Sequence, residues 1–249
     1  MIDPSEIHII YGEDPLPMTM ALLSAIGLER ELRPDMLIGV KPNLVLASPA
    51  SSGATTHPEI VEGIIRYLQA HGFQRLLILE GSWVGASTRE AFRVCGYEKL
   101  SRQYGVPLLD LKGDPPEPRQ AGGMSIPVCR TALSVDYLIN VPVLKAHCQT
   151  ELTCALKNLK GCLPDSEKRH FHAMGLHKPI AHLATVLKPA LNLVDAIAGD
   201  LTFEEGGNPV PMDRIFAGKD AVLVDAYAAS LLGYAPADIA YIPMEIGRA

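Results

Sequence analysis

Short apolar runs alternate with amphipathic stretches along most of the chain. Six runs have the length and residue types of buried strands, at residues 36–40, 76–79, 106–111, 135–143, 191–195 and 215–218. Apolar residues recur at helical spacing over residues 60–68, 152–159, 179–187 and 220–232. This alternation predicts an α/β fold, in which helices flank a largely parallel sheet.

Two helix beginnings have capping sequences. Thr56 and Glu59 form an S/T-x-x-E capping box with Pro58 in the first turn, and Ser87 and Glu90 repeat the pattern. We therefore expect a helix to begin at each of these points.

The centre of the chain differs in composition from the rest. Residues 113–123 contain three prolines and three glycines, which predicts a turn-rich loop. Residues 141–190 contain five of the eight histidines, and seven lysines and arginines against three acidic residues. No repeat or low-complexity tract divides the chain. The sequence therefore predicts one α/β domain over residues 1–249, with a Pro/Gly-rich and basic, histidine-rich insertion at about 113–190.

Polar side chains follow the predicted strands. They are Lys41, Asn43, Glu80, Ser82, Lys145, His147 and Asp195. Ligands of open α/β sheets bind beyond the carboxyl ends of the strands. These side chains therefore predict a cleft at that edge of the sheet.

The charge distribution suggests what the cleft binds. The whole chain has a net charge of -6, which disfavours nucleic acid and anionic membrane surfaces as partners. The basic segment 141–190 instead predicts a pocket for a small anion, a carboxylate or a phosphate. We expect Lys145 and Lys157 to bind it, and expect Lys145→Met to weaken anion binding with little effect on stability.

Imidazole and amine groups could supply acid–base chemistry in such a cleft. His147 or His172 would serve as general acid or base, because an ordinary imidazole pKa is about 6.5. A lysine desolvated by the apolar residues 141–144 could instead be the base or form a Schiff base. Glu80 and Asp195 would orient these groups or hold a divalent cation.

The cofactor stays open at this point. Cys148, Cys154 and Cys162 are spaced C-x5-C-x7-C, which fits neither zinc pairs nor a ferredoxin cluster, so we expect no common metal for the three. His170 and His172, two residues apart, would share a face of an extended segment and could bind zinc, nickel or iron with neighbouring histidines. The sequence has none of the usual P-loop, dinucleotide, zincin or α/β-hydrolase motifs.

No apolar run approaches the roughly 18 residues of a membrane span. The first residues have neither the basic start nor the apolar stretch of a signal peptide. We therefore expect a cytoplasmic location and no membrane partner.

Several blocks carry a family resemblance. They are Lys41-Pro42-Asn43, Thr55-Thr56-His57-Pro58-Glu59, Glu80-Gly81, residues 140–147, residues 155–161 and residues 194–197. Together they resemble the domain of unknown function 362 family over about residues 36–233. Many members carry an additional ferredoxin-like cysteine module, which this chain lacks. The arrangement of lysines and histidines is also loosely similar to the lactate racemase family, without a matching block of residues.

The resemblance implies which positions recur in the family, but not their chemical roles. These positions are Lys41, Asn43, Thr56, His57, Glu80, Lys145, His147, Thr153, Lys157, Asn158, Lys168, His172, Asp195 and Asp225.

Two functions remain open. The first is an enzyme core that binds a small anionic metabolite at the strand ends and uses lysine and histidine acid–base chemistry. Its catalytic candidates are Lys145, His147, Lys157, His172 and Glu80, and its ligand-binding candidates are Lys41, Asn43, Thr56, His57, Asn158, Lys168 and Asp195. The second is a redox or metallocentre-associated module, of iron–sulfur type, without turnover of its own. The substrate and the oligomeric state do not follow from the sequence.

Overall fold

A seven-stranded sheet organises the computed structural model, which describes residues 2–246. The strand order is β1-β11-β10-β7-β2-β3-β4. The strands are β1 (His8–Tyr11), β2 (Ile38–Pro42), β3 (Leu76–Glu80), β4 (Leu108–Asp110), β7 (Tyr137–Val141), β10 (Leu191–Asp200) and β11 (Pro209–Gly218). Strands β10, β7, β2, β3 and β4 are parallel, while β11 pairs antiparallel with both β10 and β1. The predicted α/β class with a largely parallel sheet is confirmed.

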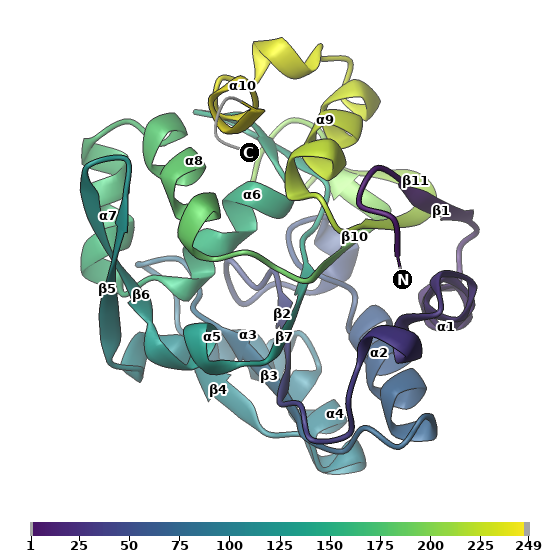
Figure 1. Ribbon diagram of the computed structural model, residues 1–249. Helices are drawn as coiled ribbons and strands as arrows, with labels where there is room; N and C mark the ends of the chain where they lie inside the picture. Colours follow the sequence, from purple (N-terminus) through teal and green to yellow (C-terminus); the bar gives the residue numbers. More distant parts are fainter. Residues whose placement is uncertain (1, 247–249) are drawn as a thin grey trace.

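Helices cover both faces of this sheet (Figure 1). They are α1 (Pro15–Ile26), α2 (Pro58–Ala70), α3 (Thr88–Val94), α4 (Tyr97–Tyr104), α5 (Arg130–Ser134), α6 (Ala155–Asn158), α7 (Asp165–Ala173), α8 (His177–Val186), α9 (Ala221–Leu231) and α10 (Tyr241–Ile246). Helices α1 to α4 contribute to one apolar core, and α6 to α10 contribute to the other. Within β3, Leu76 and Ile78 belong to the first core, whereas Leu77 and Leu79 belong to the second.

The segment predicted as an insertion contains a central strand of the sheet. β7 lies between β10 and β2, and all five of its residues are buried. Two hairpins of this segment lie outside the seven-stranded sheet. Before β7 comes the hairpin of β5 (Pro116–Ala121) and β6 (Met124–Cys129), and after it comes the hairpin of β8 (Lys145–His147) and β9 (Glu151–Thr153). Segment 113–190 is therefore not one continuous insertion, because the apolar residues of β7 require burial on both faces.

The Pro/Gly-rich residues 113–123, where the sequence predicted a loop, contain the whole of strand β5 and the turn that follows it. Gly122 and Gly123 have φ angles of +52° and +80°, which suits a two-residue hairpin turn. The prolines are compatible with β5 because this strand pairs on one side with β6 alone, within a two-stranded sheet.

Both predicted helix beginnings are confirmed, as α2 and α3, but one of the two predicted caps is not. Ser87 caps α3 by accepting a hydrogen bond from Glu90 N at 3.2 Å, as its sequence predicts. Thr56 caps nothing, because its hydroxyl donates to Val141 O and accepts from Asn43 N, both at 2.8 Å. Thr56 thus joins the ends of β2 and β7, and α2 begins after His57. The helix expected over 152–159 is reduced to α6, since β9 takes its first residues.

Candidate functional site

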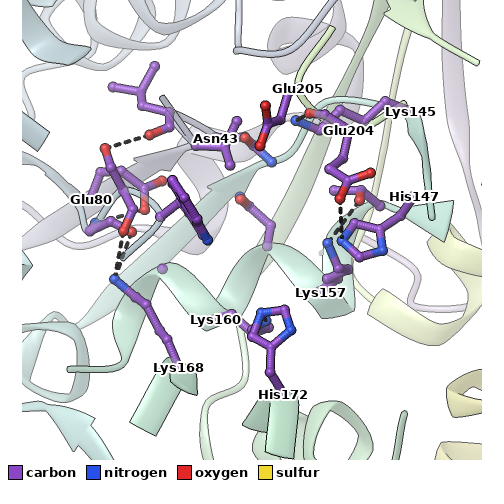
Figure 2. Close-up of a pocket in the computed structure, with 18 residues that line it drawn as sticks. Asn43, Glu80, Lys145, His147, Lys157, Lys160, Lys168, His172, Glu204 and Glu205 are labelled. Atoms are coloured by element: carbon purple, nitrogen blue, oxygen red, sulfur yellow. Dashed lines mark hydrogen bonds and ion pairs between the residues drawn. The ribbon is translucent and has the colours of Figure 1, made fainter. Parts of the chain in front are cut away.

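The carboxyl ends of the parallel strands face a cavity of ≈ 140 Å³ (Figure 2). Its charged and polar lining comes from the loops after β2, β3 and β10, from the β8–β9 hairpin, and from α6, α7 and the 3-10 turn between them (Leu159–Cys162). The titratable and amide side chains include Asn43, Glu80, Lys145, His147, Lys157, Asn158, Lys160, Lys168, His172, Glu204 and Glu205. Of the strand-end residues named from the sequence, Asn43, Glu80, Ser82, Lys145 and His147 line this cavity.

Glu80 is engaged by a buried lysine. Lys41 Nζ donates to Glu80 Oε2 at 2.9 Å, and both side chains are buried. Glu80 Oε1 accepts from Gly81 N at 2.7 Å. Gly161 packs against this pair so closely that a Cβ there would lie 2.7 Å from Lys41 Nζ. The Lys41–Glu80 pair is therefore tightly packed. Glu80 lines the cavity, whereas Lys41 does not.

Lys145 is held by backbone carbonyls. Its Nζ donates to Ala54 O at 2.6 Å and to Glu204 O at 2.7 Å. Burial lowers the pKa of Lys145 to about 7. These bonds tie β8 to two loops, so the expectation that Lys145→Met leaves stability unchanged is not supported by this geometry. Removing the amine would leave two buried carbonyls without their donor.

Lys157 and Lys160 make fewer hydrogen bonds than Lys145 and Lys168. Among residues 2–246, neither has a carboxylate oxygen within 4.0 Å. Lys157 Nζ donates to Thr153 Oγ1 at 3.1 Å, and Lys160 Nζ lies 3.2 Å from His172 Nε2. Burial and the neighbouring Lys160 and Lys145 hold the pKa of Lys157 well below its usual value. Burial and Lys168 lower the pKa of Lys160 to about 8.

Lys168 closes the other end of the cavity. Its Nζ donates to Gly81 O at 3.0 Å, to Ser82 O at 2.9 Å and to Asp165 Oδ1 at 3.2 Å. Lys168 thus joins α7 to the loop after β3. Burial lowers its pKa.

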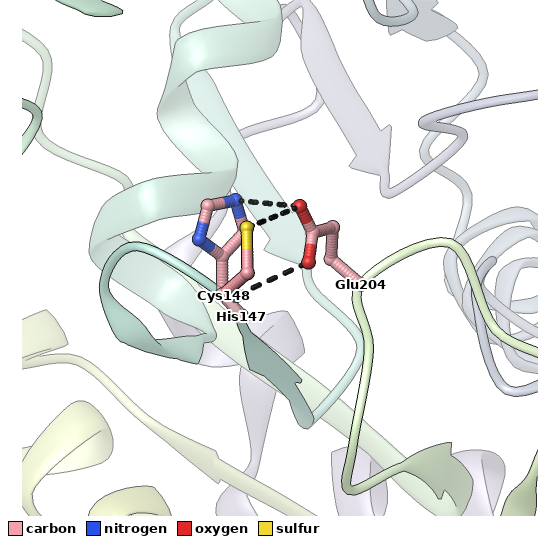
Figure 3. Close-up of side chains that lie close together, drawn as sticks. All are labelled: His147, Cys148 and Glu204. Atoms are coloured by element: carbon pink, nitrogen blue, oxygen red, sulfur yellow. Dashed lines mark hydrogen bonds and ion pairs between the residues drawn. The ribbon is translucent and has the colours of Figure 1, made fainter.

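His147, Cys148 and Glu204 come together at the opposite end (Figure 3). Their potential ligand atoms lie within 4.8 Å of one another. In the described part of the chain, this is the one place where three or more potential metal ligands come together in this way. His147 Nε2 lies 3.4 Å from Glu204 Oε1, and Cys148 Sγ lies 3.2 Å from the same oxygen. Neither Cys154 nor Cys162 belongs to this group.

The hydrogen bonds of His147 do not suit a metal ligand. Gln149 N donates to His147 Nδ1 at 3.0 Å, so the proton of the neutral ring is on Nε2 and faces Glu204. Burial and the nearby Lys157 lower the pKa of His147, which favours this neutral ring. A metal on Nε2 would require the proton of the neutral ring to move to Nδ1, which could then no longer accept the hydrogen bond from Gln149 N. As they are arranged, the three side chains form a hydrogen-bonded group.

The predicted histidine pair adopts a different geometry. His170 and His172 lie on helix α7 and not on an extended segment, so they point in different directions. His170 Nδ1 lies 3.3 Å from Glu167, whereas His172 lines the cavity and its Nδ1 lies 3.2 Å from Gln149 Oε1. Burial and Lys160 lower the pKa of His172.

Besides Lys41, three predicted ligand-binding residues, Thr56, His57 and Asp195, lie outside the cavity lining. Asp195 Oδ2 accepts from His57 N at 2.7 Å and lies 2.8 Å from His57 Nδ1, and Thr56 joins β2 to β7. Asn43 does line the cavity, and its buried Oδ1 has no hydrogen-bond partner among residues 2–246. That oxygen is available to a donor on a ligand.

The sequence did not single out Lys160, Glu204 or Glu205. Lys160 follows Lys157 by three residues, a spacing that can place both on one helical face. The two glutamates follow β10, whose end the apolar pattern placed at residue 195 although the strand continues to residue 200. Extending the strand to that point would have identified this loop.

Comparison with known proteins identifies the family. A family model described as Domain of unknown function (DUF362) matches residues 38–230, most of the chain. The chain belongs to this family. The family resemblance of the sequence blocks is thus confirmed. All residues that line the cavity lie within the matched region, residues 38–230.

One protein is similar to this chain in sequence, and two solved structures are similar to it in fold. A thylakoid-associated protein of Synechocystis sp. is 24% identical over 220 residues, which are 86% of this chain and 68% of that protein. The lactate racemase apoprotein from Thermoanaerobacterium thermosaccharolyticum has a TM-score of 0.57 at 14% identity, over 90% of this chain and 56% of that chain. A protein from Thermotoga maritima has a TM-score of 0.59 at 15% identity, over 90% of this chain and 60% of that chain.

These solved structures share the fold, and the DUF362 chain spans about three fifths of their length. In residues 2–246 no helix is both long and apolar enough to cross a membrane. The cytoplasmic location stays a prediction.

Proposed function

We propose that the protein is an enzyme core that binds a small anionic metabolite at the carboxyl edge of its sheet. The observation that carries this proposal is the group formed by Lys145, Lys157 and Lys160. All three line one cavity, and within the described part of the chain none has a carboxylate oxygen within 4.0 Å. Bringing several amines together in a buried site is unfavourable unless an anion compensates them.

Other features of the cavity suit a small oxygen-rich ligand. The unpaired Asn43 Oδ1 can accept a hydrogen bond from a hydroxyl or protonated group of that ligand. The similar fold of lactate racemase, whose name gives a small hydroxy acid as its substrate, supports a carboxylate in preference to a larger metabolite.

Acid–base chemistry in this cavity falls to the lysines more readily than to the histidines. The lowered pKa values of Lys145 and Lys160, about 7 and about 8, allow their amines to exchange protons near neutral pH. His147 has its pKa lowered and its Nε2–H directed at Glu204, so it serves as a neutral hydrogen-bond donor.

Anion binding is tested by thermal-shift titration with phosphate, lactate and malonate. We expect at least one of these anions to stabilise the wild type, and Lys160→Met to weaken its binding about tenfold, as loss of a charged hydrogen bond predicts. Lys178→Met, which removes an exposed lysine outside the cavity, is the matched control and should bind like wild type. Equal responses of wild type and Lys160→Met, or none from either, would contradict the proposal.

The pH dependence provides a second test of the same proposal. An anion favours the charged form of the lysines, so its binding should be stronger at pH 6.5 than at pH 9, where groups with pKa values of about 7 and about 8 are neutral. Binding that does not change over this range would exclude the lysine cluster as the anion site.

The metallocentre alternative rests on the group His147, Cys148 and Glu204. Metal analysis of anaerobically purified protein distinguishes the two functions. Stoichiometric iron with labile sulfide would favour the alternative over the anion-binding enzyme core.

A further inference from the structure

Lys157 makes fewer hydrogen bonds than Lys145 and Lys168 of the same cavity. Lys145 donates to two carbonyls, and Lys168 donates to two carbonyls and a carboxylate. Lys157 Nζ has Thr153 Oγ1 as its hydrogen-bond partner, at 3.1 Å, and the half-buried side chain lines the cavity. A bound molecule can therefore reach the Lys157 amine by displacing one hydrogen bond, whereas Lys145 and Lys168 would each have to give up two or more.

The backbone beneath Lys157 is firmly anchored. Asp225 of α9 accepts from Ala155 N at 2.6 Å and from Leu156 N at 3.2 Å, at the start of α6. Asn158 Nδ2 donates to Asn140 Oδ1 of β7 at 2.8 Å. The short helix that carries Lys157 is thus anchored to both α9 and β7.

The surroundings of Lys157 favour an uncharged amine. Burial and the two neighbouring lysines disfavour its protonated form. A lysine that is desolvated or close to another cation is a recognised nucleophile toward carbonyl groups, because the free amine has an available electron pair.

We propose that Lys157 forms an imine with a small 2-oxo carboxylate. This inference rests on the proposed anion site and names its substrate class. The carboxylate would lie against Lys160 and Lys145, which leaves the adjacent carbonyl carbon near Lys157. Asn43 Oδ1 would accept a hydrogen bond from the hydroxyl of the first adduct.

The step needs no oxidant or reductant. The Lys157 electron pair forms a C–N bond to the carbonyl carbon, while the C=O π electrons move to oxygen. That oxygen takes a proton from the Lys160 ammonium, and the nitrogen of Lys157 gives up a proton to the Lys160 amine, which restores the ammonium. The resulting carbinolamine then loses water to give the imine, so amine and ketone are converted to imine and water.

Borohydride trapping tests this proposal. The protein is incubated with pyruvate, reduced with sodium cyanoborohydride, and examined by intact mass and peptide mapping. We expect one reduced adduct, located on Lys157, and a trapping rate at least tenfold above that of Lys157→Met. Lys157→Arg keeps a cation without a free amine, so it should also form no adduct; a native circular dichroism spectrum shows that this variant is folded. Lys178→Met should be trapped like wild type.

Separate outcomes distinguish this inference from the proposed function. Stabilisation by lactate or phosphate without a Lys157 adduct would overturn the imine and leave the anion site intact. Adducts spread over exposed lysines, or retained in Lys157→Arg, would also overturn it. Absence of both adduct and anion stabilisation would overturn the inference and the proposed function together.

Discussion

Several buried charged side chains of this protein are stabilised by backbone groups. Asp200 Oδ1 accepts from Thr202 N at 2.8 Å and from Phe203 N at 3.0 Å, and its Oδ2 accepts from Asn208 N at 2.8 Å. This carboxylate therefore shapes the loop that carries Glu204 into the cavity. Lys145 donates to the carbonyl of Glu204 in the same loop. Asp200 and Lys145 therefore both hold the loop of Glu204 in position through hydrogen bonds to its backbone.

The His57–Asp195 pair predicts a pH-dependent contribution to stability. Burial opposes the charge on His57, but the Asp195 carboxylate 2.8 Å away outweighs it, so the pKa of His57 is raised. The pair therefore stabilises the fold fully below pH ~6.5, and this contribution is lost as the pH rises through the raised folded pKa.

The comparison of wild type with His57→Ala measures this effect. The difference in free energy of unfolding should shrink between pH 6 and pH 8.5, by at most ~1.4 kcal/mol per pH unit. Urea denaturation at several pH values provides the measurement. A difference that grows with pH would mean that His57 is held neutral in the folded protein.

At the scale of elements, short segments outside the sheet carry the cavity residues. Helix α6 has four residues, too few to be stable alone, yet it positions Lys157 and Asn158. Its first amides are bound by Asp225, and its neighbour Asn140 donates to Ala155 O at 3.0 Å. Tertiary hydrogen bonds therefore replace the helical length that this element lacks.

The β5–β6 hairpin allows a matched test of two adjacent glycines. Both Gly122 and Gly123 have positive φ, but a Cβ at Gly122 would collide with the buried ring of His182, whereas a Cβ at Gly123 meets open space. Gly123→Ala should cost ~1–2 kcal/mol from backbone strain, and Gly122→Ala clearly more because the α8 ring must also move. Thermal denaturation of both variants checks this order. Equal costs would show that the hairpin moves away from α8 without penalty.

At the scale of the molecule, one sheet separates two apolar cores. Alternate residues of β3 enter opposite cores, as Ile78 and Leu79 show, and both are fully buried. The two cores share this strand, so loosening one should weaken the other.

We therefore expect Ile78→Ala and Leu79→Ala to destabilise the protein by similar amounts, each ~2–5 kcal/mol. Each variant should unfold in a single transition, in which far-ultraviolet and near-ultraviolet circular dichroism change together. Two separate transitions in either variant would show that the cores unfold independently.

The sequence by itself determined the strands that are buried along their whole length. Strands β2, β3 and β7 are buried on both faces, so their composition alone is distinctive, and Glu80 and Lys145 could be placed at or just beyond strand ends by counting along the chain. The α/β class follows from the same local pattern. This pattern is easy to recognise because a strand that is buried on both faces needs apolar side chains at almost every one of a few consecutive positions.

The tertiary structure alone decided which of these polar residues is available for chemistry. Lys41 and Glu80 are 39 positions apart and become each other's partners, and Lys145 binds a carbonyl 91 positions away. The capping pattern at Thr56 was overridden by the carbonyl of Val141, 85 positions away. A hydrogen bond depends on distance and angle between two groups, so no pattern confined to neighbouring residues can predict bonds between segments this far apart.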